Sequence, residues 1–245
     1  FCHAGHYDRG QGVMPDSLIH FDRVTKSYRT VFGRPRDPVF TDVSLHLGEH
    51  EIIGLAGPSG CGKSTLIRMF LGLTEWQGGR IRYRGTDLAR VSRRDRRLIH
   101  REVQVVFQDP HGAFNPRWRL RRSVTEPLRV FRIRDHDQTT RVTEQLSRLG
   151  LEDGVLDRYP HQLSGGQLQR LALARCLLVR PRCLLLDEAS AMLDLSVQAQ
   201  MMALIRQLHE QQGISVLLIS HDEDLVAAIC QRSYRFVGGQ VKETG

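Results

Sequence analysis

The sequence feature that most constrains the fold is a glycine-rich segment between an apolar run and a helical pattern. Residues 51–56 form an apolar run after Glu51, residues 57–64 read Gly-Pro-Ser-Gly-Cys-Gly-Lys-Ser, and a helical pattern begins at Lys63. The segment fits G-x-x-x-x-G-K-[ST], and a strand before it and a helix after it are the context that this motif requires. Backbone N–H groups of such a turn can surround the phosphates of a nucleotide, and the helix dipole favours their charge. We therefore expect a strand–loop–helix unit that binds phosphate.

Side chains of this loop have distinct predicted roles. Lys63 would neutralise phosphate charge, and the Ser64 hydroxyl would ligate Mg²⁺. The residues predicted to bind the nucleotide, ATP, in this loop are Gly57, Pro58, Ser59, Gly60, Cys61, Gly62, Lys63, Ser64 and Thr65.

A second apolar run, residues 183–186, ends in the carboxylates Asp187 and Glu188. Open α/β sheets bind ligands at the carboxyl ends of their strands. Asp187 is predicted to support the Mg²⁺ shell, and Glu188 to polarise the attacking water as a general base. Two acids at the end of a strand often have no function, but their pairing with the glycine-rich loop favours the functional interpretation.

Strand-like and helical patterns alternate along most of the chain, which predicts βαβ units and a parallel sheet. Residues 31–38 hold Gly33, Pro35 and Pro38 and are predicted to form a loop. Residues 109–160 are polar and arginine-rich and look like a helical insertion. The remaining expectations are strands at 18–24, 41–47, 81–84, 103–107, 183–187 and 214–220, and helices at 141–149, 168–179 and 197–212.

The motif Leu163-Ser164-Gly165-Gly166-Gln167 opens the helix before the Asp187 strand. Ser164 suits an ordinary helix N-cap, but a cap does not explain Gly-Gly-Gln. Here the chain resembles the ABC ATPase family, from Leu18 to Val241. The resemblance implies an α/β P-loop NTPase fold with a mostly parallel core sheet, an antiparallel β subdomain and an inserted α-helical subdomain at about 109–170. It also implies that Ser164, Gly165, Gly166 and Gln167 serve the γ-phosphate held by a second subunit in a head-to-tail dimer.

Three further residues occur in the order in which the family has its matching residues. Gln108 matches the glutamine that senses Mg²⁺ and the attacking water, His221 the histidine that contacts the γ-phosphate, and Tyr28 the aromatic that stacks on adenine. Alone, they would be a surface glutamine, a core histidine and a packing tyrosine. The resemblance thus implies Lys63, Gln108, Glu188 and His221 as catalytic residues, and Ser64, Gln108 and Asp187 as Mg²⁺ ligands.

The stretch after Glu188 departs from the family's usual Pro-Thr-Ser-Ala-Leu-Asp and reads Ala-Ser-Ala-Met-Leu-Asp. Leu193 and Asp194 keep an inter-subunit contact, whereas Ala191 cannot supply the usual serine hydroxyl. This difference suits a heterodimer with unequal sites, although a homodimer stays open.

The leading functional hypothesis is a transport ATPase that closes on ATP binding and reopens on hydrolysis. A groove beside Gln108, lined by residues 109–134, would pass this motion to membrane subunits. The rival is a DNA-repair or ribosome-associated ABC ATPase, but the chain has no heptad run, no C-x-x-C and a single P-loop. A non-hydrolysing relative should lack Lys63 or Glu188, and both are present. We therefore expect no nucleic-acid partner.

Residues 106–110, 115–117 and 159–164 look like those of importers for peptides, nickel and metal chelates. Such importers use two different ATPases, two membrane permeases and an extracytoplasmic binding protein. The run from Asp187 to Ala189, continuing to Ala199, resembles the nickel branch, and the chain stops at Gly245 without the cysteine-containing tail of many peptide-importer subunits. We expect nickel or a metal chelate as cargo, with peptides as the alternative.

Composition limits the cellular setting. The 245 residues hold no apolar run of about 18 and no signal-peptide pattern, so we expect no membrane span. Five scattered cysteines fit a reducing cytoplasm, and a peripheral place on the cytoplasmic face of the bacterial inner membrane is expected. The net charge of +8 is interpreted as a solvated basic face, with an anionic membrane or partner as the alternative. Residues 1–17 are expected to be a flexible leader, with Met14 as a natural start and Cys2, His3 and His6 as weak metal candidates.

Overall fold

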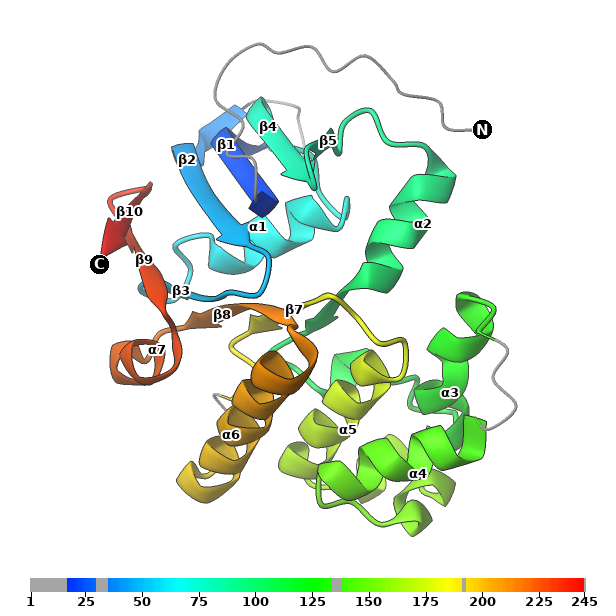
Figure 1. Ribbon diagram of the computed structural model, residues 1–245. Coiled ribbons are helices and arrows are strands. Elements are labelled where there is room, and N and C mark those ends of the chain that lie inside the picture. Colours follow the sequence, from blue (N-terminus) through cyan, green and yellow to red (C-terminus); the bar gives the residue numbers. More distant parts are fainter. Residues whose placement is uncertain (1–16, 30–34, 134–137, 191–192, 245) are drawn as a thin grey trace.

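The structure is a computed structural model that describes residues 17–29, 35–133, 138–190 and 193–244. Its strands form a larger, mostly parallel sheet and a smaller antiparallel sheet (Figure 1). The larger sheet has the order β10 (Gln240–Thr244), β9 (Arg232–Val237), β3 (Ile52–Ala56), β8 (Ser215–Ser220), β7 (Cys183–Asp187) and β6 (Val103–Val106). The smaller sheet has the order β2 (Pro35–Gly48), β1 (Ser17–Arg29), β4 (Gly78–Tyr83) and β5 (Thr86–Asp87).

The central strands of the larger sheet are apolar because both of their faces are buried. Strands β3, β7 and β8 are buried at every position. Alternate residues point to opposite faces of a strand; in β7, Leu185 packs toward the smaller sheet, and Leu184 and Leu186 pack toward the helices on the other face. The unbroken apolar runs of the sequence therefore correspond to strands covered on both sides.

The prediction of a loop at residues 31–38 was wrong for residues 35–38, which belong to β2. Residues 31–34 lie outside the described part. In the register, Pro38 lies opposite Ser27 and Pro35 opposite Arg29 of β1. Strand β2 is at the edge of its sheet, where proline is tolerated because one side of the strand needs no partner for its N–H groups.

Two helices pack on the side of the larger sheet that faces the smaller sheet. Helix α1 (Lys63–Phe70) lies between the two sheets (Figure 1), where Leu66, Met69 and Phe70 are buried. Helix α2 (Arg93–Glu102) was not predicted from the sequence. Its arginines at 93, 94, 97 and 101 are exposed, which agrees with a solvated basic face, and Ile99 is its one buried residue.

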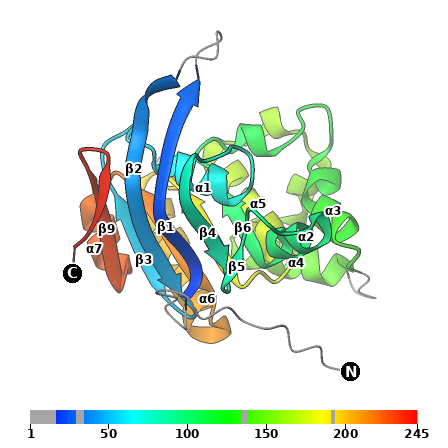
Figure 2. The ribbon, with the colours of Figure 1, turned by 90° about the horizontal axis from the view of Figure 1, so that it is seen from above.

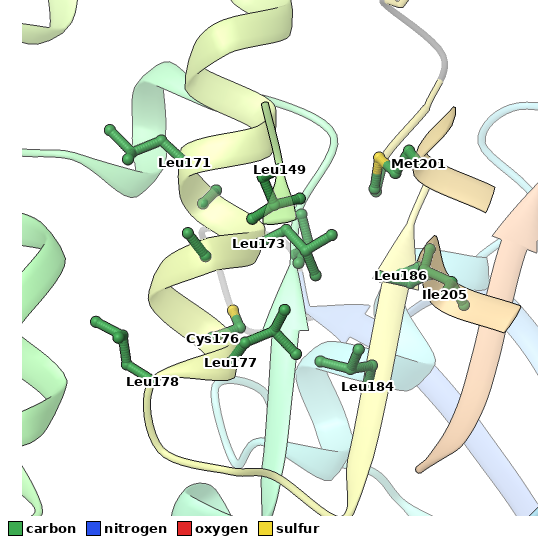
Figure 3. Packing of buried hydrophobic residues seen from close by; sticks show 14 of the residues in the cluster. Leu149, Leu171, Leu173, Cys176, Leu177, Leu178, Leu184, Leu186, Met201 and Ile205 are labelled. Atoms are coloured by element: carbon green, nitrogen blue, oxygen red, sulfur yellow. The ribbon is translucent and has the colours of Figure 1, made fainter. Parts of the chain in front are cut away.

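Further helices pack on the opposite face of the larger sheet. Helix α6 (Leu195–Gln212) covers the second face of the larger sheet together with α5 (Gly165–Leu177), and α7 (Glu223–Ile229) lies beside β3 and β8. Figure 3 shows Leu184 and Leu186 of β7 between Leu173 and Leu177 of α5 on one side and the α6 residues Met201 and Ile205 on the other.

Helices α3 (Leu120–Val130) and α4 (Gln138–Arg148) pack against α5 and lie to one side of the sheets in both views (Figure 2). Three short 3₁₀ helices complete this group, at His111–Ala113, Asp153–Asp157 and Pro160–Gln162. The proposed boundary of the helical subdomain at about 109–170 falls inside α5, which continues to Leu177 and also covers the sheet.

No helix in the described part of the chain is long and apolar enough to cross a membrane. Residues 1–16, with Cys2, His3, His6 and Met14, lie outside the described residues, and so does Ala191. Strand β1 begins at Ser17, the last residue of the expected leader.

Candidate functional site

The glycine-rich loop connects β3 to α1 and adopts a backbone that most residues disfavour. Gly57, Gly60 and Gly62 all have positive φ. A Cβ on Gly57 would lie 2.8 Å from the Cβ of Phe236, and one on Gly62 would lie 2.8 Å from the ring of Phe40. Gly62 also caps α1 with φ of 111°. The loop thus needs glycine both for its conformation and for its close packing against β9 and β2.

The Lys63 ammonium group is turned back over the loop and is almost completely buried. Its Nζ donates to the carbonyl oxygens of Gly57 at 2.7 Å and Pro58 at 2.9 Å, and the side chain is 4% exposed. The same nitrogen lies 3.5 Å from Oε1 of Glu188. A positive charge is therefore held over the loop and beside the end of β7.

Ser64 and Asp187 join the two predicted halves of the site, although they are 123 residues apart in the sequence. The Ser64 hydroxyl donates to Oδ1 of Asp187 at 2.8 Å. Asp187 is 3% exposed, and burial raises the pKa of its carboxyl above the ordinary value, partly opposed by the hydrogen bond from Ser64. A buried carboxylate that is held in this way is a good ligand for a cation.

Glu188 continues from β7 into a strained backbone. Its φ is 49°, in the left-handed region, while its N–H still donates to the carbonyl of Ile219 at 3.0 Å. Such strain persists where the surrounding structure requires it, often at functional sites. Its carboxylate lies between Lys63 and His221, whose Nδ1 is 3.7 Å from Oε2. The His221 side chain is 55% exposed, so it is no core histidine.

Residues 164–167 form the N-terminus of α5. The Ser164 hydroxyl accepts from the N–H of Gln167 at 3.2 Å, and Gln167 Oε1 accepts from the N–H of Ser164 at 3.1 Å. This reciprocal capping box satisfies two backbone donors. Nothing lies within 4 Å of a Cβ built on Gly165, and one on Gly166 would be 3.4 Å from Leu193. The ordinary N-cap role is real, and the role in a second subunit stays a prediction.

The structure does not place every predicted residue against the loop. Gln108 is exposed after β6. Tyr28 is 40% exposed, and its ring centroid lies 4.4 Å from the Lys26 ammonium. Asp194 caps α6 by accepting from the N–H of Val197 at 2.9 Å. The roles of these residues toward Mg²⁺, adenine and a second subunit stay predictions.

A groove runs beside the Gln108 segment, and we call it the α2–α3 groove. It consists of two adjoining hollows of about 390 and 590 Å³, which share Val130, Phe131 and His100. The first has a largely apolar lining from β6, α3 and α5, including Phe107, Pro127, Ala172 and Cys176. The second has an arginine rim from Arg93, Arg96, Arg97 and Arg129. Described residues of the predicted 109–134 segment thus line part of the groove, and α2, β6 and α5 supply most of the rest.

Comparison with known proteins identifies the family. Residues 40–191 match the ABC transporter family, which is more than half of the chain. The chain belongs to the ABC transporter family.

Relatives and solved structures extend this match beyond the family region. The nickel import ATP-binding protein NikE of Escherichia coli (strain K12) is 45% identical over 207 residues, which cover 84% of this chain and 77% of the relative. NikE of Shigella dysenteriae serotype 1 matches to the same extent.

Among solved structures, the dimeric bacterial ABC transporter cassette MJ0796 has a TM-score of 0.83 at 29% identity, covering 93% of this chain and 98% of that one. MJ0796 in a post-hydrolysis state bound to ADP and Pi has a TM-score of 0.82 at 28% identity and the same coverage. Clostridium perfringens cbiO1, part of the ABC transporter complex cbiONQ, has a TM-score of 0.76 at 25% identity, covering 93% and 87% of the two chains.

These likenesses confirm the predicted fold class, an α/β P-loop NTPase of the ABC type, and the predicted enzyme class, an ATPase. Sequence reasoning missed one polar contact next to the site. Gln169, two residues after the Ser164–Gln167 motif, donates from Nε2 to the carbonyl of Phe107 at 3.1 Å. A glutamine inside the apolar helical run 168–179 was the available signal, because buried amides need partners.

Proposed function

We propose that this chain is the ATP-hydrolysing subunit of an ABC importer on the cytoplasmic face of the bacterial inner membrane. One observation carries the proposal: at the end of β7, Lys63 lies 3.5 Å from Glu188, and the Ser64 hydroxyl donates to Asp187 at 2.8 Å. This arrangement places a cation, a hydroxyl and two carboxylates where a phosphate-binding loop opens.

The loop from Gly57 to Thr65 would hold the phosphates of ATP. Its positive-φ glycines let N–H groups point toward an anion, and the N-terminus of α1 adds its dipole. Lys63 Nζ now binds two loop carbonyls, and a phosphate would compete for the same ammonium group. Tyr28 would stack on the adenine.

Mg²⁺ fits the donor set next to this loop. Ser64 and Asp187 already share a hydrogen bond, and a cation would stabilise the ionised Asp187 carboxylate against the desolvation that raises its pKa. Ser64, Asp187 and Gln108 would hold the ion with oxygens of the phosphates. When bound, Mg²⁺ supplies positive charge that stabilises the phosphoryl group during transfer.

Glu188 is the proposed general base. Its carboxylate lies at the carboxyl end of β7 beside Lys63, where it would take a proton from the water that attacks the γ-phosphorus. His221 is close enough to Glu188 to help to position this water, and its exposed side chain would contact the γ-phosphate.

The second subunit would complete the site. Ser164 and the open backbone at Gly165 form an exposed helix N-terminus that can accept an anion from outside the chain. The solved MJ0796 cassette is dimeric, which supports this arrangement. We propose a second ATPase subunit, identical or different, opposite this chain.

The α2–α3 groove is the proposed docking site for a segment of a membrane permease. Its apolar floor and exposed Val130 suit an apolar anchor, and the arginine rim suits acidic flanks. The groove includes Phe107, next to Gln108, so a docked segment could respond to the nucleotide site. Two permeases and an extracytoplasmic binding protein complete the proposed importer.

Nickel or a nickel chelate is the proposed cargo. NikE relatives named for nickel import are 45% identical over most of the chain, which supports nickel over peptides. The described residues hold no group of three or more His, Cys, Asp or Glu that could bind a metal.

The test is uptake in cells that lack this subunit, with the gene restored as wild type or as Glu188→Gln. We expect loss of high-affinity nickel accumulation with normal di- and tripeptide uptake, and rescue by the wild type only. Loss of peptide uptake with normal nickel accumulation would contradict the cargo, and rescue by Glu188→Gln would contradict the role of the ATPase site.

A further inference from the structure

Helix α5 carries Ser164 at its N-terminus and, one turn later, a buried glutamine that reaches the Gln108 segment. Gln169 is 3% exposed, and its Nε2 donates to the carbonyl oxygen of Phe107 at 3.1 Å. That carbonyl and the N–H of Gln108 belong to the same peptide group. Because a peptide group is planar, holding its carbonyl also fixes the direction of the Gln108 N–H, two residues after the end of β6.

Two other side chains of α5 bind backbone carbonyls of the same segment. Cys176 donates from Sγ to Val105 at 3.4 Å, and Arg175 donates to Ala113 while it pairs with Glu126 of α3 at 3.0 Å. Cys176 lies on α5 in Figure 3, among the residues that face the strands. Hydrogen bonds thus join α5 to backbone carbonyls of segment 105–113 on both sides of Gln108.

Space-filling alone does not explain a glutamine at position 169. Its Oε1 is buried and has no hydrogen-bond partner among the described residues. A leucine of similar size would fill the position without an unsatisfied oxygen, so the amide is favourable only through its N–H bond to Phe107.

We propose that Gln169 is a positioning residue that ties Gln108 to the helix bearing Ser164. When a second subunit engages Ser164, movement of α5 would carry the peptide group of Gln108 with it. The inference rests on the proposed roles of Gln108 and Ser164, and it adds a mechanical link between the nucleotide bound by this chain and the nucleotide bound by its partner.

The test is a double-mutant cycle in the assembled transporter, with ATP hydrolysis and nucleotide binding measured separately. Gln169→Leu should lower kcat by about 10- to 100-fold, as expected for a misplaced catalytic group. The KM for ATP should stay within about twofold, because the loop that holds the phosphates is untouched, and the Mg²⁺ concentration for half-maximal rate should rise. In a Gln108→Ala background, Gln169→Leu should have little further effect.

Arg170→Met is the matched control, because it also removes a bond from α5 to a backbone carbonyl, that of Leu149 at 3.1 Å, but does not touch the Gln108 peptide group. We expect it to keep the wild-type kcat. If Gln169→Leu fails to fold, Gln169→Met enters the same cycle. An equal loss of kcat with and without Gln108, or an unchanged kcat in the single variant, would overturn the proposal. Loss of all nucleotide binding in wild-type protein would instead count against the proposed function.

Discussion

Lys63 Nζ and Glu188 Oε1 lie 3.5 Å apart, and both side chains are almost buried. The two residues come from α1 and from the end of β7, and each has a predicted role toward the γ-phosphate. In this arrangement Glu188 partly neutralises the cation that we propose binds phosphate. A γ-phosphate would compete with Glu188 for Lys63, which would couple phosphate binding to the release of the proposed base.

Glu188→Gln should separate binding from chemistry. ATP should bind at least as tightly as in the wild type, since a negative charge next to the phosphates is removed and the loop is intact. Turnover should fall by about 10²–10³, as is typical when one catalytic group is lost. Equilibrium nucleotide binding and phosphate release in the assembled transporter measure the two effects. Glu210→Gln, an exposed change on α6, is the control, and normal turnover in Glu188→Gln would refute the assignment of the base.

Asp187→Asn should stabilise the nucleotide-free chain at neutral pH. The pKa of Asp187 is raised by burial, so the folded state disfavours the ionised form. This destabilisation is present above the folded-state pKa and disappears as the pH falls through it. We expect a higher Tm by a few degrees, given about 2–4 °C per kcal/mol for a domain of this size.

The rise in Tm caused by Asp187→Asn should become smaller as the pH falls. The further rise in Tm that Mg²⁺ and ATP give the wild type should be largely lost in this variant. Thermal unfolding over a pH series, with and without Mg²⁺ and ATP, checks both effects. Asp157→Asn, whose side chain is exposed, should show neither. A lower Tm for Asp187→Asn at neutral pH would show that the buried carboxylate does not destabilise the folded chain.

Cys61 should be the reactive thiol of the described part of the chain. It is partly exposed in the phosphate loop, with Sγ 4.0 Å from Lys63 Nζ, whereas Cys176 and Cys183 are buried. Burial raises the pKa of Cys176 to about 12 and that of Cys230 to about 12, which lowers their thiolate fraction.

In a Cys2→Ser background, a maleimide should therefore block ATP binding, and bound ATP with Mg²⁺ should protect. Peptide mapping by mass spectrometry would locate the label. The remaining activity of a Cys61→Ala variant should no longer respond to the maleimide. Inactivation that persists in Cys61→Ala would place the sensitive thiol elsewhere.

The geometry of the candidate phosphate site could be predicted because its residues follow local rules. A loop such as 57–64 needs its glycines and lysine in a fixed order, and the carboxyl ends of parallel strands meet at one edge, which brought Asp187 to Ser64. The strain at Glu188 is not visible in the sequence, because it depends on the continued pairing with Ile219.

Other features depend on tertiary context that a sequence pattern does not carry. Helix α2 has Ile99 as its one buried residue, so it lacks the apolar period that marks most helices. Pro35 and Pro38 suggested a loop because the edge position of β2 was unknown. The bond from Gln169 to Phe107 joins residues 62 apart, and only packing of α5 against β6 creates it.

The central claim is that the site is completed by Ser164 of a second subunit. Steady-state ATP hydrolysis per chain, measured over a concentration series alongside sedimentation, tests it most directly, with and without the other transporter subunits. We predict that the isolated chain binds ATP but hydrolyses it poorly, that association raises the rate, and that Ser164→Arg abolishes the rise while ATP binding at Lys63 persists. A fully active monomer, with a rate per chain independent of concentration and of Ser164, would contradict the account.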